Sequence, residues 1–177
     1  MPRPWKTLGD RTIHETPWLR LREDLVELPT GRQMTYCVVD TGHCAGVLPF
    51  LDDGSVLLVR QYRHIAERVT WEMPTGGVGE GETPEQAAQR ELAEEAGYRA
   101  AQLQHVCTYH TSKSSIDETA HLYIGTGLTP AEATPDDTEE IERAVVPFEK
   151  AVAMVLSGEI TDSMTIIAVL HADRMQR

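Results

Sequence analysis

Residues 76–98 constrain the fold of this chain more than any other stretch, because they predict a glycine-rich turn that leads into a capped helix. Thr83 is a good N-cap and begins a T-x-x-Q capping box. Pro84 suits the first helical position, where its missing N–H costs nothing. Gly97 supplies a left-handed stop. The sequence therefore predicts a helix over residues 84–96.

Three carboxylates of this helix, Glu91, Glu94 and Glu95, fall at positions i, i+3 and i+4 on one face. Like charges at this spacing destabilise a helix by about 0.2–0.5 kcal/mol per pair. Such a face is either solvated, which is the ordinary case for a run of charges, or neutralised by a bound cation. Oxygen ligands with little steric cover suit Mg²⁺ or Mn²⁺, which also bridge to phosphates. An apolar stripe that can pack lies beside them and consists of Ala88, Leu92 and Ala96.

The wider spacing favours the cation over the solvated face. Gly76 is followed after five residues by Glu82, and after seven more by R-E-L-A-E-E-A-G-Y, which begins at Arg90. This pattern matches the Nudix box, G-x5-E-x7-R-E-U-x-E-E-x-G-U, with Tyr98 in the last aliphatic position as a small departure. Seven fixed residues at fixed spacing arise by chance at roughly one start site in 10⁸. The chain therefore resembles a Nudix hydrolase.

Composition limits the other possibilities. A length of 177 residues is enough for one core. The net charge of −12 argues against nucleic acid as a partner, because backbone binding depends on a basic surface. An acidic chain can still bind a phosphorylated substrate if divalent cations lie between them.

No apolar run approaches the ~20 residues of a membrane span, so no membrane partner is expected. Residues 1–10 lack the apolar core of a signal peptide, and a cytoplasmic location is expected. Three cysteines without a C-x-x-C pair indicate reduced thiols, not a disulfide framework or a zinc site. They are Cys37, Cys44 and Cys107.

Alternating and turn-bounded segments predict an N-terminal antiparallel β region over residues 1–40. The resemblance implies that residues 41–177 form a Nudix catalytic domain. Strands are expected at 11–15, 19–28 and 33–40. A hairpin is expected from 46–51 and 55–62, and its second strand is apolar enough on both faces to be central. Further strands are predicted at 69–73, 102–109, 121–125 and 141–146, a polar loop at 110–118, and helices at 148–157 and 161–175. The fold class is α+β, and the resemblance implies a Nudix fold, an α/β/α sandwich with a mixed sheet.

Four segments outside the box resemble the ADP-ribose and nucleoside-diphosphate-sugar pyrophosphatase branch: V-R-Q-Y-R, W-E-M-P-T-G-G, S-K-S-S-I-D-E and the ending from Pro147. The resemblance implies a homodimer whose N-terminal β region exchanges between subunits and contributes to the nucleotide site, where Trp18 is a candidate contact. Lys113 stands where that branch has a proline. It is a candidate contact to a phosphate or a sugar hydroxyl, or else a solvated loop lysine.

The resemblance also implies hydrolysis of a P–O–P linkage by a metal-activated water, with more than one Mg²⁺ or Mn²⁺ ion. Arg90 is expected to orient Glu91, and Arg63 to contact phosphate. The expected metal ligands are Glu91, Glu94, Glu95, the backbone carbonyl of Thr75 and, through water, Glu82.

The general base in this branch usually comes from a loop glutamate before the last strand. Glu139 and Glu140 are the candidates, and the motif favours Glu139, although both could be solvated loop acids. The leading hypothesis is a pyrophosphatase that splits ADP-ribose or another nucleoside diphosphate sugar into a nucleoside monophosphate and a sugar phosphate. The alternatives are a house-cleaning hydrolase of other nucleoside diphosphate derivatives or nucleoside triphosphates, and a non-catalytic ligand-binding Nudix domain.

Overall fold

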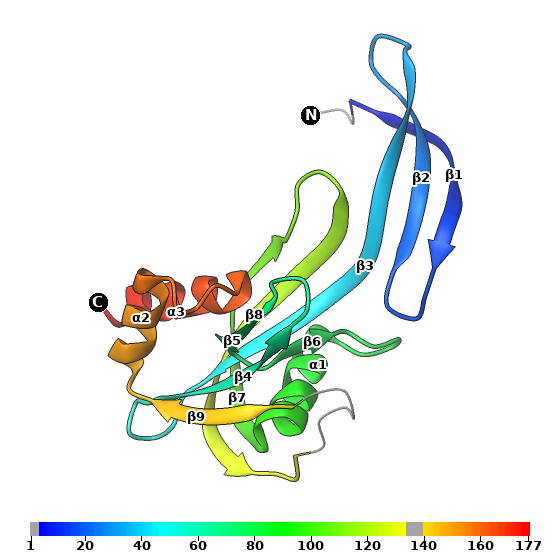
Figure 1. Cartoon of the computed structure of the whole chain (residues 1–177). Helices are drawn as coiled ribbons and strands as arrows, with labels where there is room; N and C mark the ends of the chain where they lie inside the picture. Colours follow the sequence, from blue (N-terminus) through cyan, green and yellow to red (C-terminus); the bar gives the residue numbers. More distant parts are fainter. Residues whose placement is uncertain (1–3, 134–139) are drawn as a thin grey trace. The chain divides into compact units, whose positions relative to one another are not determined.

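The computed structural model describes residues 4–133 and 140–177 of the chain. Contacts within the chain divide it into two compact units (Figure 1). The first unit contains the chain up to His43 together with Tyr109–Thr119, and the second contains Cys44–Thr108 and Ala120–Arg177.

Antiparallel strands make up most of the first unit. β1 (Lys6–Glu15) pairs with β2 (Arg20–Glu27), and β2 pairs with the first part of β3 (Gln33–Pro49). The predicted N-terminal antiparallel region is confirmed, with β1 beginning earlier than expected. The tight turn between β2 and β3 uses the left-handed backbone of Gly31, with φ +79°.

The strands of the first unit bury few apolar side chains. All ten residues of β1 are exposed, and Val26 and Val38 are the only buried apolar residues of β2 and of the part of β3 up to His43. Ion pairs link the strands instead: Arg22 Nη1 lies 2.7 Å from an Asp40 carboxylate oxygen. Backbone ladders and polar contacts therefore hold these strands together more than an apolar core does.

The second unit contains a small sheet with the order β5-β4-β9. β4 (Val56–Arg63) is central, as predicted, and pairs with β5 (Arg68–Glu72) and β9 (Glu142–Val146). The predicted hairpin of 46–51 and 55–62 is wrong. β3 and β4 belong to different sheets, joined by the single bridge between Phe50 and Val56, because β5 and β9 occupy the two edges of β4.

The larger sheet has the strand order β1-β2-β3-β8-β7, with β6 (Thr75–Gly77) paired to β3. β7 (Tyr98–His110) and β8 (Ile116–Pro130) are longer than the sequence predicted. β8 begins inside the expected polar loop. Immediately before it, the carbonyl of Ser115 accepts a hydrogen bond from the N–H of Val39, so backbone pairing outweighs the polar composition there.

The predicted catalytic helix forms, but in two parts. α1 (Pro84–Glu91) has the complete capping box, and a π-helical turn, η1 (Leu92–Ala96), continues it. Gly97 ends the turn with φ +77°, as predicted. The expected apolar stripe is buried against strands of both sheets, in a core that includes Ala45, Val47, Leu57, Val59, Ala87, Ala88, Leu92 and Ala96.

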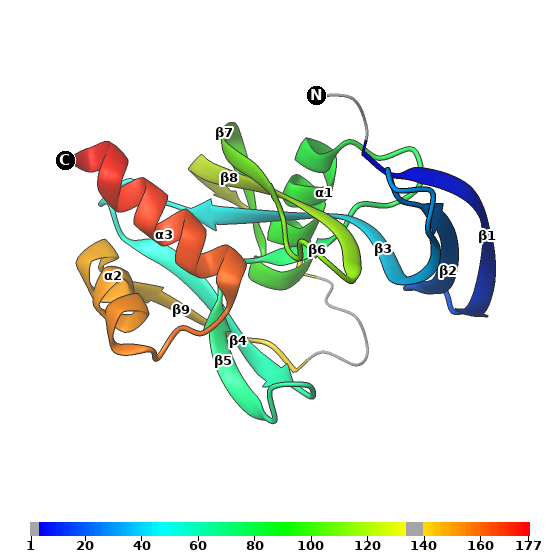
Figure 2. The same cartoon turned by 90° about the horizontal axis from the view of Figure 1, so that it is seen from above.

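Two further helices, α2 (Phe148–Ser157) and α3 (Ser163–Gln176), lie side by side. In Figure 2 the strands of the second unit lie between this pair and α1. Asp162 caps α3, and the buried Thr165 accepts a hydrogen bond from the N–H of Met73 at 2.9 Å. The start of α3 is thereby fixed to the segment that leads into Thr75. Among the described residues, no helix is long and apolar enough to cross a membrane.

Candidate active site

Arg90 is the centre of the helical carboxylate cluster. Its Nη1 donates to Glu91 at 2.6 Å and to Glu94 at 3.0 Å, and its Nη2 donates to the carbonyl of Gly77 at 2.8 Å. Nε and Nη2 also donate to the two carboxylate oxygens of Glu82, at 3.0 and 2.9 Å. These contacts to Glu82 are the main cause that raises the pKa of Arg90, while burial lowers it and Glu91 and Glu94 raise it further.

Glu82 is held on the turn before the helix. Besides the two bonds from Arg90, it accepts the N–H of Gly79 at 3.0 Å. The hydrogen bonds from Arg90 are the largest cause that lowers the pKa of Glu82, against the opposing effect of burial. The glycine turn and the helix are therefore joined through one ion pair that spans eight residues.

Glu95 lies in a different environment from the other helical acids. Its side chain accepts the N–H of Thr75 at 3.0 Å, and only 2% of the residue is exposed. Arg143 on β9 donates to the backbone carbonyl of Glu95 at 2.6 Å. A purely solvated acidic face is therefore excluded for Glu95, which is fixed between β6 and β9.

The acids fit a hard divalent cation in chemistry, because all their ligand atoms are oxygen. Gly76 lets one of them approach closely: a Cβ atom there would lie 1.9 Å from Oε1 of Glu91. In the part of the chain that the structure describes, no three His, Cys, Asp or Glu side chains converge into a set that could hold a metal ion. Glu91 and Glu94 each contact Nη1 of Arg90 through one carboxylate oxygen.

Arg63 lies at the end of β4, on a pocket of about 250 Å³ that Thr75 and Asp162 also line. Its Nη2 donates to a carboxylate oxygen of Glu72 at 2.6 Å, and its Nε lies within 3.1 Å of both oxygens. Burial alone would lower the pKa of Arg63, but the hydrogen bonds and charge of Glu72, followed by the charges of Glu95 and Asp162, raise it. The charge of Glu95, one of the helical acids, therefore acts on Arg63.

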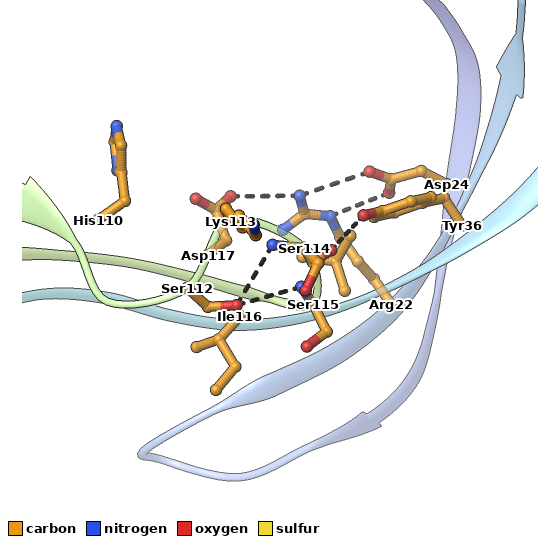
Figure 3. A pocket seen from close by; sticks show the side chains of 11 residues that line it. Arg22, Asp24, Tyr36, His110, Ser112, Lys113, Ser114, Ser115, Ile116 and Asp117 are labelled. Atoms are coloured by element: carbon orange, nitrogen blue, oxygen red, sulfur yellow. Dashed lines mark hydrogen bonds and ion pairs between the residues drawn. The ribbon is translucent and has the colours of Figure 1, made fainter.

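Trp18 and Lys113, the other predicted substrate contacts, belong to the first unit. Trp18 lies in the turn after β1 and is 81% exposed. Lys113 lines a pocket of about 500 Å³ formed within this unit (Figure 3). Arg22 pairs there with Asp24 and Asp117, and the hydroxyl of Tyr36 donates to the carbonyl of Ser114.

Of the two candidate bases, Glu139 lies outside the described residues. Glu140 is exposed and lines a pocket of about 410 Å³ with Tyr62 and Glu142. The choice between them therefore stays a prediction.

Sequence reasoning missed three residues that shape this site: Glu72, Gly76 as a steric requirement, and Arg143. Gly76 was identified as a fixed position of the motif, and its closeness to Glu91 is visible only in the structure. Glu72 lies in the W-E-M-P-T-G-G segment, whose resemblance to the pyrophosphatase branch could have marked it as a site residue. No local pattern marks Arg143, which reaches Glu95 across 48 residues of sequence.

Comparison with known proteins identifies the family. The NUDIX domain model matches residues 41–164, and the nucleoside diphosphate sugar hydrolase N-terminal domain model matches residues 5–39. The chain therefore belongs to the Nudix hydrolase family, as the box predicted, and the prediction that it is an enzyme of this family is confirmed.

Relatives match over most of the chain. ADP-ribose pyrophosphatases from Bacillus subtilis and Mycobacterium tuberculosis are each 33% identical; each match covers 94% of this chain, and 91% and 82% of the respective relative. A GDP-mannose pyrophosphatase from Yersinia enterocolitica is 27% identical, with 88% of each chain covered. A solved structure described as ADP compounds hydrolase has a TM-score of 0.85 at 18% identity, covering 98% of this chain and 94% of that chain, which confirms the predicted fold class.

We expect Gly76→Ala to lower kcat by about 10²-fold, because displacing a reacting group by roughly 1 Å can cost that much. The new Cβ would overlap the carboxylate of Glu91, which can swing away, so the free energy of unfolding should fall by less than about 1 kcal/mol. Gly77→Ala is the matched control, because a Cβ there meets no atom within 4 Å. Steady-state kinetics and urea unfolding measure both effects. Equal rates for the two variants would contradict the required close approach.

Proposed function

We propose that the protein is a metal-dependent pyrophosphatase that hydrolyses the P–O–P bond of ADP-ribose or another nucleoside diphosphate sugar. The products are a nucleoside monophosphate and a sugar phosphate. The observation that carries the proposal is the set of box acids gathered by Arg90 beside the Arg63 pocket. The names of the relatives support the substrate class, ADP-ribose first and other nucleotide sugars second.

In this proposal, Glu91, Glu94, Glu95 and the carbonyl of Thr75 hold more than one Mg²⁺ or Mn²⁺ ion, with Glu82 contributing through water. The bound metal would lower the pKa of a water molecule and neutralise charge on the phosphates. Glu95 is already fixed by the N–H of Thr75, so these two residues need no rearrangement relative to each other. Arg90 keeps Glu91 and Glu94 side by side despite their like charges.

The remaining roles concern the substrate and the proton. Arg63 binds a phosphate oxygen from the pocket it lines with Thr75. Glu139 takes a proton from the attacking water, with Glu140 as the alternative. Lys113 and Trp18 contact the nucleotide or the sugar and so influence which substrate is preferred. A cytoplasmic location stays a prediction.

We further propose that residues 1–40 are the dimerising region and residues 41–177 the catalytic domain. The support is physical: β1 has no buried residue, and Leu8 and Ile13 of this strand are among the exposed large apolar side chains of the first unit. An exposed edge strand of this length that carries large apolar side chains is a liability unless another chain covers it.

Analytical ultracentrifugation tests the dimer directly. The wild type should sediment as two chains, and Ile13→Asp should shift the equilibrium toward one, because it replaces an exposed apolar side chain of β1 with a charge. A wild type that stays monomeric at every concentration would exclude the dimer.

A substrate panel tests the proposed activity. The wild type, incubated with Mg²⁺ or Mn²⁺, should convert ADP-ribose or another nucleoside diphosphate sugar into a monophosphate and a sugar phosphate, resolved by mass. Glu94→Gln should lower kcat by about 10²-fold or more, since it removes a ligand charge. Glu85→Gln, an exposed acid on the same helix, is the control and should leave kcat unchanged. The panel includes dinucleoside polyphosphates and nucleoside triphosphates, and activity on triphosphates alone would favour the house-cleaning alternative.

Separate glutamine variants distinguish the two candidate bases. Glu139→Gln should lower kcat by about 10²–10⁴-fold, the usual contribution of general-base catalysis, with metal affinity unchanged. Glu140→Gln should stay near the wild-type rate. The reverse pattern would transfer the role to Glu140, and two near-normal rates would exclude both.

A further inference from the structure

Glu72 is a buried acid to which the proposed mechanism gives no role. It lies at the end of β5, and its side chain is only 5% exposed. Burying a carboxylate is costly unless it is paired and hydrogen-bonded. Glu72 meets both conditions: Arg63 donates to both of its oxygens, and the hydroxyl of Thr70 donates to Oε1.

The pairing fixes one edge of the Arg63 guanidinium. Nε and Nη2 both face Glu72, and because the group is planar, two such bonds set its orientation as well as its position. Nη1 has no hydrogen-bond partner among the described residues, and Arg63 lines the pocket that Thr75 and Asp162 share. The arginine is 40% exposed, while its partner is almost fully enclosed. The buried carboxylate of Glu72 therefore holds the half-exposed guanidinium of Arg63.

We propose that Glu72 is a positioning residue that holds the Arg63 guanidinium with Nη1 directed toward a phosphate oxygen of the substrate. The inference rests on the proposed function, which assigns Arg63 to phosphate binding. A free arginine samples many rotamers, and ordering it on substrate binding would weaken affinity. With Glu72 in place, that ordering is completed during folding, before the substrate arrives.

A purely structural ion pair would have different consequences. Removing it would lower the stability of the protein but would leave the KM of the folded enzyme unchanged. A positioning residue changes KM, and does so only while Arg63 is present to be positioned. A double-mutant cycle separates these two cases because it measures the dependence of one substitution on the other.

The cycle compares the wild type, Glu72→Gln, Arg63→Lys and the double variant, with a nucleoside diphosphate sugar that the wild type hydrolyses. Lysine keeps the charge at position 63 but cannot form the two-pronged contact. Glu72→Gln should raise KM about tenfold with kcat within about threefold, the pattern for loss of uniform substrate binding. In the Arg63→Lys background, the same substitution should change KM by less than about twofold. The dissociation constant of a non-hydrolysable methylene analogue should follow KM.

Glu142→Gln is the matched control, because Glu142 on β9 also pairs with an arginine of β4, Arg60, but its side chain is 58% exposed and that of Glu72 is 5% exposed. Its KM should equal that of the wild type. Thermal unfolding checks that each variant is folded, and Glu72→Asp, which keeps the charge but shortens the side chain, replaces Glu72→Gln if that variant does not fold.

Equal effects of Glu72→Gln in both arginine and lysine backgrounds, or an unchanged KM in the single variant, would overturn the positioning role alone. A wild type that hydrolyses no nucleoside diphosphate sugar would overturn the proposed function and this inference together. The two failures are therefore distinguishable in the same experiment.

Discussion

The hydrogen bonds of Arg90 are the interaction on which the candidate site depends. Three acids of the box, Glu82, Glu91 and Glu94, would repel one another without a positive charge between them, and one guanidinium contacts all three. Its bond to the carbonyl of Gly77 adds the glycine turn to the same cluster. Because arginine stays charged at any physiological pH, the carboxylates remain gathered before any cation arrives. Like charges that are close in sequence are usually exposed to solvent. In this chain the guanidinium of Arg90 pairs with them instead.

Two further constraints place this cluster beside a pocket. The absence of a side chain at Gly76 lets the β6 turn approach the helix closely, and Glu95 accepts the N–H of Thr75 from the same strand. On the neighbouring sheet, Glu72 holds Arg63 over the pocket that Thr75 lines. Polar side chains therefore link η1 to β6 and β4 to β5, in addition to the apolar core. Substitutions that leave the core intact can therefore still disturb the site.

The parts of the structure set by local spacing could be predicted from the sequence. The capping box at Thr83, the stop at Gly97 and the buried stripe of Ala88, Leu92 and Ala96 depend on residues within one helix, and all are confirmed. The parts set by pairing between distant segments could not. The expected β3–β4 hairpin is wrong because β5 and β9 occupy the edges of β4, and β8 begins within a polar loop. Glu72 and Arg143 were missed for the same reason, since their partners lie on other elements: Arg63 on β4 and Glu95 on η1. Glu139 lies outside the described residues, so the general base stays a prediction.

The proposed role of the acids gathered by Arg90 is to hold the metal ions of a nucleotide pyrophosphatase. The most direct measurement is anomalous diffraction from crystals grown with Mn²⁺ and a non-hydrolysable analogue of ADP-ribose. Manganese density is expected at the carboxylates of Glu91, Glu94 and Glu95, with the diphosphate of the analogue beside it and beside Arg63. Manganese absent from these acids at saturating concentration, with Glu91 and Glu94 still bound to Arg90, would contradict the proposed role.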